Sequence, residues 1–222
     1  MNLPNYLSLS RIFAVPVLIW ILSSRLFEGQ REILASLVFI AASVTDAFDG
    51  YLARKRGQIT TVGILLDPLA DKLMITAAFV SLVQFNPAVV PAWVAVIVIG
   101  REFLVSGLRG IAASEGFTIE ASDLGKLKMV VQIVAVVAAI LAHRWFYWPV
   151  GEFIFPVKLV AHAAVWIMVV VSLVSAIDYF VAFWSKIDNS SKRRRRRRSF
   201  ILSRRRKFAA PAQLHTEPPQ EE

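Results

Sequence analysis

The chain has 222 residues, of which 56% are hydrophobic and 18% charged, and its mean hydropathy of +0.58 lies well above that of an ordinary soluble domain. It contains no cysteine, which excludes disulfides and thiolate metal sites, and its three histidines lack the spacing of metal ligands. Residues 1–185 hold 13 basic and 12 acidic residues, a net charge of +1, whereas residues 186–222 hold 12 and 4, a net charge of +8. A metal site must therefore be built from carboxylates.

Six apolar segments approach the roughly 20 residues that a helix needs to cross a bilayer. They cover about residues 12–24, 33–52, 63–85, 89–112, 130–142 and 157–183. The first is short, and Leu7 and Leu9 either extend it or form an interfacial turn before Pro16. We therefore predict an all-α, polytopic membrane protein with six transmembrane helices, a short N-terminal interfacial segment and no cleavable signal peptide.

Basic residues are distributed unevenly between the two sides that six spans would create. With the N-terminus inside, most of the Lys and Arg residues, including those of the tail, lie on the inner side. The basic residues of the outer turns are Arg25, Arg31, Arg144 and, at the start of the last span, Lys158. Because inner loops are enriched in Lys and Arg, we predict an integral cytoplasmic (inner) membrane protein with both termini in the cytoplasm.

Four aspartates lie at the facing ends of the second and third segments. Asp46 and Asp49 are three residues apart, so they share one face of a helix. Asp67 and Asp71 are four apart and also share a face. Each carboxylate at membrane depth costs roughly 2.5–3.5 kcal/mol, so four on two neighbouring antiparallel helices require a compensating charge. Two Mg²⁺ or Mn²⁺ ions would neutralise them and match their hard oxygen ligands.

The acids belong to a longer pattern, Asp46-x2-Asp49-Gly50-x2-Ala53-Arg54-x8-Gly63-x3-Asp67-x3-Asp71. This pattern resembles the motif of the CDP-alcohol phosphatidyltransferase family at all eight fixed positions and both long spacings. With typical residue frequencies of roughly 5–8%, eight matches by chance are negligible. Two of the fixed positions are glycines, which leave room for the phosphates of a ligand to approach the backbone.

The resemblance implies a role for each residue of the motif. In the family, the first three aspartates bind metal, and the fourth binds metal and serves as general base. The implied metal ligands are Asp46, Asp49, Asp67 and Asp71, and the implied base is Asp71. The implied CDP-binding residues are Asp46, Asp49, Gly50, Ala53, Arg54, Gly63 and Asp67. Paired cations would screen the diphosphate while a positioned carboxylate activates the attacking alcohol.

Segments outside the motif resemble the branch of the family that uses glycerol 3-phosphate, and the resemblance covers about residues 3–185. They are Pro4-Asn5-Tyr6-Leu7-Ser8-Leu9-Ser10-Arg11, Arg101-Glu102, Gly107-Leu108-Arg109 and Gly125-Lys126-Leu127-Lys128. Ser8 replaces the usual Thr but keeps the hydroxyl, and Met129 departs from the expected Thr. The resemblance implies transfer of the phosphatidyl group of CDP-diacylglycerol to the 1-hydroxyl of sn-glycerol 3-phosphate, giving phosphatidylglycerol phosphate and CMP.

Basic residues at the inner ends of the fourth and fifth segments are candidate ligands of the acceptor phosphate. They are Arg101, Arg109, Lys126 and Lys128. Arginine suits this task because its guanidinium matches phosphate geometry. The alternative is that these side chains snorkel to lipid headgroups as topology anchors, or that Arg101 pairs with Glu102. Candidates for the nucleotide side of the site, or for capping an interfacial helix, are Asn5, Ser8 and Arg11.

Other functions stay open from the sequence. A phosphatidylserine, inositol-phosphate or cardiolipin synthase of the same family would use another acceptor. An uncharged acceptor would leave Arg109 and Lys126 without a phosphate to bind. A divalent-cation transporter also uses intramembrane acids, but these acids sit at one interface and no inverted repeat is visible. The acids could also be helix-end charges paired with Arg54, Lys55 and Lys72.

Residues 186–222 form a basic tail, which we predict to be largely disordered and separate from the membrane domain at 1–185. Residues 192–198 are seven consecutive basic residues, and residues 204–207 add four more after a short apolar interval. Such runs suit anionic lipid, at about 1 kcal/mol per residue, or fix the topology. No nucleic-acid-binding fold accompanies them, so we expect no nucleic-acid partner. The family resemblance also implies a homodimer.

Overall fold

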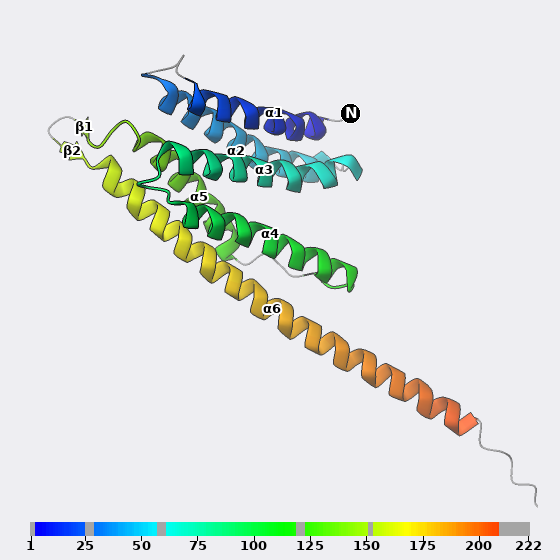
Figure 1. Cartoon of the computed structure of the whole chain (residues 1–222). Coiled ribbons are helices and arrows are strands. Elements are labelled where there is room, and N and C mark those ends of the chain that lie inside the picture. The colour runs from blue at the N-terminus through cyan, green and yellow to red at the C-terminus, as the bar shows by residue number, and fades with distance from the viewer. Residues whose placement is uncertain (1–2, 25–28, 57–60, 119–122, 151–152, 209–222) are drawn as a thin grey trace, which may run out of the picture. The chain divides into compact units, whose positions relative to one another are not determined.

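The computed structural model describes the chain except residues 1–2, 25–28, 57–60, 119–122, 151–152 and 209–222. At 3–7, 46–56, 61–65, 67, 123–126, 150, 153 and 188–208 it describes the backbone alone. The helices are α1 (Leu3–Ser23), α2 (Arg31–Arg56), α3 (Thr61–Phe85), α4 (Ala92–Ser114), α5 (Asp123–Leu141) and α6 (Val157–Phe208). Strands β1 (Trp148–Val150) and β2 (Phe153–Phe155) pair antiparallel between α5 and α6 (Figure 1).

The six helices correspond to the six predicted segments, but their ends differ. α1 begins at Leu3 and continues through Pro16, so the N-terminal residues form its first turns in place of a separate interfacial segment. α5 begins at Asp123, which puts positions 126 and 128 inside the helix. The β1–β2 hairpin was not predicted, because its short apolar strands lie between two longer apolar segments.

Within the part of the chain that the structure describes, two helical stretches are long and apolar enough to cross a membrane, Pro68–Phe85 of α3 and Val157–Ile187 of α6. Ser8–Ser23 and Leu127–Leu141 are apolar but shorter. Large apolar side chains such as Leu37, Val96 and Leu159 are exposed, as expected of surfaces that face lipid. The all-α class is confirmed and is consistent with a membrane protein, while six crossing helices stay a prediction.

The chain divides into two compact units, Met1–Phe180 and Val181–Glu222, and α6 contributes residues to both. In the first unit, α1 packs on α2 and α3, α2 packs on α5, and α3 packs on α4 and α5. Fully buried Leu18, Phe39 and Leu82 fill its core, and small residues let helices approach closely. The predicted division after residue 185 stays a prediction.

A polar cluster joins the start of α2 to the ends of α3 and α5. Glu32 Oε1 accepts a hydrogen bond from Arg31 Nε at 3.1 Å and lies 3.0 Å from His143 Nδ1. The His143 ring stacks on Phe85, with centroids 3.9 Å apart. Burial raises the pKa of the Glu32 carboxyl, but hydrogen bonds from its backbone, Arg31 and His143 outweigh burial and keep the pKa below its ordinary 4.5.

Candidate active site

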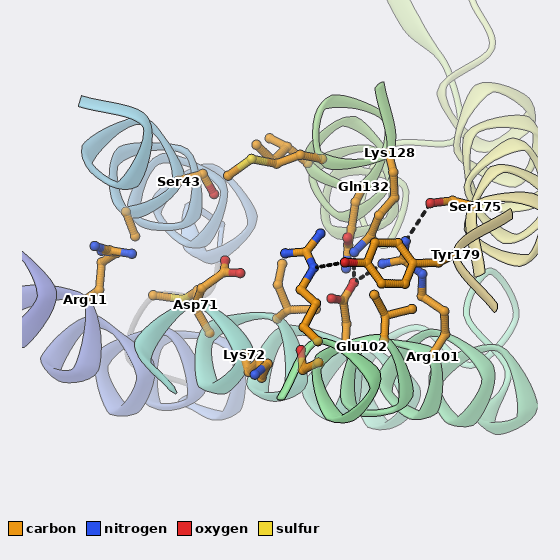
Figure 2. A pocket seen from close by; sticks show the side chains of 18 residues that line it. Arg11, Ser43, Asp71, Lys72, Arg101, Glu102, Lys128, Gln132, Ser175 and Tyr179 are labelled. Atoms are coloured by element: carbon orange, nitrogen blue, oxygen red, sulfur yellow. Dashed lines mark hydrogen bonds and ion pairs between the residues drawn. The ribbon is translucent and has the colours of Figure 1, made fainter. Parts of the chain in front are cut away.

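A cavity of about 240 Å³ lies within the first unit and is lined by side chains from all six helices (Figure 2). Its polar and charged lining residues are Arg11, Ser43, Asp71, Lys72, Arg101, Glu102, Ser106, Arg109, Lys128, Gln132, Ser175 and Tyr179. Basic side chains outnumber acidic ones in this lining. The described part of the lining therefore carries a net positive charge, which suits a small anionic ligand.

The side of the cavity formed by α1, α2 and α3 carries a carboxylate. Asp71 on α3 is half-buried and faces the cavity, and Arg11 on α1, which is 2% exposed, faces it as well (Figure 2). Ser43 on α2 donates its hydroxyl to the Phe39 carbonyl at 2.8 Å, a bond within one helical turn. This side therefore offers one acid close to a buried guanidinium.

The opposite side of the cavity is organised by Glu102 on α4. Its Oε1 accepts a hydrogen bond from Arg101 Nη1 at 2.9 Å and also pairs with Lys128 Nζ of α5. Arg101 reaches α6 through Nη2, which donates to Ser175 Oγ at 2.9 Å. One carboxylate thus holds two cations at the cavity wall, where burial strengthens the attraction between the carboxylate and each cation.

Arg109, two turns beyond Arg101 on α4, is fixed by a second contact with α6. Its Nε donates to the Tyr179 hydroxyl at 2.9 Å, and its guanidinium carbon lies 5.1 Å from the centroid of the same ring. The hydroxyl and the ring therefore fix the guanidinium together, by a hydrogen bond and a cation–π contact.

The structure brings several predicted site residues to this cavity. Asp71, the predicted base, lines it together with Arg101, Arg109 and Lys128, the predicted phosphate ligands, and Arg11. Ser8 is fully buried on α1 and does not line the cavity. Other predicted side chains lie outside the described residues: Asn5, Asp46, Asp49, Gly50, Ala53, Arg54, Gly63, Asp67 and Lys126.

The four aspartates predicted to bind metal lie on α2 and α3. Among the side chains that the structure describes, no three His, Asp or Glu residues gather, and three of the four predicted aspartates lie outside that set. Ala42 of α2 lines the cavity, and positions 46 and 49 follow it by four and seven residues, the repeat of one helix face. Aspartates at those two positions and Asp71 would offer oxygen ligands only, the kind that Mg²⁺ and Mn²⁺ prefer, and the metal site itself stays a prediction.

Several lining residues were not predicted. Ser175 and Tyr179 are four residues apart on α6, and no motif marks them. The sequence could have identified Gln132 on α5, because it is the only polar residue in the apolar segment 130–142. Polar side chains inside apolar helices are costly and usually face a protein interior or a functional cavity.

Comparison with known proteins gives one family. Residues 1–177 match the family described as CDP-alcohol phosphatidyltransferase. The CDP-diacylglycerol–glycerol-3-phosphate 3-phosphatidyltransferase of Bacillus subtilis is 39% identical over 200 residues, covering 86% of this chain and 99% of that protein. The protein of that name from Rickettsia bellii is 35% identical over 181 residues, covering 82% and 94%. A probable phosphatidylglycerophosphate synthase of Mycobacterium tuberculosis is 35% identical over 187 residues, covering 80% and 79%. The chain therefore belongs to the CDP-alcohol phosphatidyltransferase family.

Proposed function

We propose that this enzyme transfers the phosphatidyl group of CDP-diacylglycerol to the 1-hydroxyl of sn-glycerol 3-phosphate, producing phosphatidylglycerol phosphate and CMP. The observation that carries the proposal is one cavity in which Asp71 from α3 lies together with Arg101, Arg109 and Lys128 from α4 and α5. Relatives with this activity in their names align over most of the chain. Transfer to a phosphorylated alcohol requires a base for its hydroxyl and cations for its phosphate, and this acid and these cations can supply both.

The charge of the cavity favours a phosphate-bearing acceptor over an uncharged one. Arg101 and Lys128 converge on Glu102, and Arg109 is fixed by Tyr179, so three cations are held in place before a ligand arrives. Preorganised cations bind a dianion at a lower entropic cost than mobile side chains. Guanidinium groups also match the geometry of phosphate oxygens.

Asp71 is proposed to act as the general base. It accepts the proton of the acceptor's 1-hydroxyl, and that oxygen then attacks the lipid-side phosphorus of the diphosphate, breaking the bond to the oxygen that leaves with CMP. Asp46, Asp49, Asp67 and Asp71 would hold two Mg²⁺ or Mn²⁺ ions, which would screen the diphosphate and stabilise the leaving CMP. We assign Gly50, Ala53, Arg54 and Gly63, together with Asp46, Asp49 and Asp67, to the CDP site. Arg11 stays a candidate for its nucleotide side.

A CMP-release assay tests the proposal. Purified protein with Mg²⁺ and CDP-diacylglycerol is supplied separately with glycerol 3-phosphate, serine, inositol phosphate and phosphatidylglycerol. We expect CMP release to depend on glycerol 3-phosphate, to stop on chelation of the divalent cations, and to return when Mg²⁺ or Mn²⁺ is restored. Faster release with another acceptor would reassign the enzyme within its family, and release without any divalent cation would exclude the proposed chemistry.

We also propose that six helices cross the inner membrane, with the active site and both termini facing the cytoplasm, and that the enzyme is a homodimer. Support for the orientation comes from the concentration of Lys and Arg in the predicted inner segments. Because the chain has no cysteine, single cysteines introduced between α4 and α5, at positions 115–122, and in the β1–β2 hairpin report sidedness without background labelling. An impermeant thiol reagent outside intact cells should label the hairpin position alone. Crosslinking in native membranes tests the dimer.

A further inference from the structure

Gln132 is a buried amide that faces the candidate active site. It lies on α5, its side chain lines the cavity, and it is 3% exposed (Figure 2). Its Nε2 has no hydrogen-bond partner among the residues that the structure describes. The surrounding segment of α5 is otherwise apolar. The amide therefore faces the cavity with an unused donor.

An unused buried donor is energetically costly. Leaving such a group unpaired costs about 1–3 kcal/mol once a ligand displaces the water of the cavity. A ligand that accepts a hydrogen bond from Nε2 would remove the cost, whereas a ligand without such an acceptor would leave it in place.

The position of Gln132 indicates which part of the acceptor it meets. It follows Lys128 by four residues on α5, so it lies on the same helix face about 6 Å farther along the axis. Arg101, Arg109 and Lys128, the residues proposed to bind the phosphate, line the same cavity. A neutral amide both donates and accepts, which suits a hydroxyl better than a phosphate.

We propose that Gln132 determines acceptor specificity by donating a hydrogen bond to the secondary hydroxyl of the phosphorylated alcohol. This proposal rests on the proposed function, because it assumes an acceptor with a phosphate at one end and the attacking hydroxyl at the other. A site built to hydrogen-bond a hydroxyl strongly disfavours the analogue that lacks it, because the buried donor then stays unpaired. The enzyme should therefore distinguish glycerol 3-phosphate from its 2-deoxy analogue.

The test compares two acceptors, sn-glycerol 3-phosphate and 3-hydroxypropyl phosphate, in the wild-type enzyme and in Gln132→Met. The wild type should prefer glycerol 3-phosphate in kcat/KM by about ten-fold or more. Gln132→Met keeps the side-chain length without the donor, and its preference should fall to within about two-fold, mainly through loss of activity on glycerol 3-phosphate.

Lys128→Met is the matched control, because it removes a cation from the same face of α5. It should lower kcat/KM for both acceptors by a similar factor and keep the preference. An unchanged preference in Gln132→Met, with a wild-type melting temperature, would overturn the assignment; so would an equal loss on both acceptors, which indicates a phosphate contact. If the wild type releases no CMP with glycerol 3-phosphate, the proposed function itself fails.

Discussion

Arg109 and Tyr179 form a double contact across the candidate active site: the Arg109 Nε donates to the tyrosine hydroxyl at 2.9 Å, and the guanidinium lies over the tyrosine ring. The two residues come from α4 and α6 and are 70 positions apart in the chain. The contact fixes the direction of a guanidinium that we propose binds the acceptor phosphate. The contact therefore preorganises Arg109, and its loss should lower the affinity of the enzyme for the acceptor.

Tyr179→Phe keeps the ring and removes the hydroxyl. We expect the KM for glycerol 3-phosphate to rise about three- to ten-fold while kcat changes little, because a lost hydrogen bond of about 1 kcal/mol loosens Arg109 without removing it. Steady-state CMP release measures both constants. Tyr147→Phe, an exposed tyrosine near the β1–β2 hairpin, is the control and should match the wild type. A fall in kcat with unchanged KM would argue against a positioning role.

Asp71→Asn removes the proposed base while keeping the size of the side chain. We expect kcat to fall by about 10²-fold or more, since general-base catalysis contributes roughly that much. Single-turnover CMP release checks the chemical step directly. Asp178→Asn, at an exposed position on α6, is the matched control and should retain activity. Normal turnover in Asp71→Asn would refute the base assignment.

Glu102→Gln removes the carboxylate that Arg101 and Lys128 share. The two cations should then repel each other and bind anions more tightly, so the variant should melt at a lower temperature without anions. Inorganic phosphate should raise its melting temperature more than it raises that of the wild type. Thermal melting in detergent across a phosphate series measures both effects. Equal stabilisation by phosphate in the two proteins would contradict the shared-cation arrangement.

Glu32→Gln should make the melting temperature of the protein vary less with pH in the acidic range. The folded-state pKa of Glu32 lies below its ordinary 4.5, so the stability that its carboxylate contributes is present above that value. It is lost as the pH falls through the lower folded-state pKa. We expect a melting temperature roughly 3–10 °C below wild type at pH 7, with the difference shrinking below pH 4.5. A difference in melting temperature that stays constant from pH 7 to below pH 4.5 would contradict this assignment.

Deletion of residues 190–222 should leave turnover in detergent unchanged, because the residues proposed for chemistry lie before that point. Binding of the basic runs to anionic lipid predicts a different result in vesicles. There the truncated enzyme should lose any activation that phosphatidylglycerol gives to the full-length chain, and the loss should shrink at high salt. Equal activation of both proteins would leave the tail with a topological role.

Sequence patterns singled out some of the residues that line the cavity and missed others, while the roles assigned to them stay predictions. Asp71, Arg101, Arg109 and Lys128 were identified because their spacing or their position at helix ends distinguishes them. Tyr179 was missed because its partner lies on another helix, and sequence spacing carries no information about such a contact.

Helix boundaries were predicted less well than helix number. α5 begins at Asp123, seven residues before the apolar segment, because a polar first turn with an acidic residue stabilises a helix start without adding hydropathy. α1 likewise includes Pro4 and Asn5, since proline is tolerated in a first turn. Hydropathy reports which residues suit lipid, whereas the helix extends wherever its backbone hydrogen bonds can be satisfied.

Every helix of the bundle supplies at least one side chain to the cavity wall. No subset of helices contains the complete site, so a fragment that retains native helicity is still expected to be catalytically silent. Turnover is therefore a stringent probe of assembly, because the first catalytic event on a nascent chain has to wait until its last helix, α6, has packed against the others.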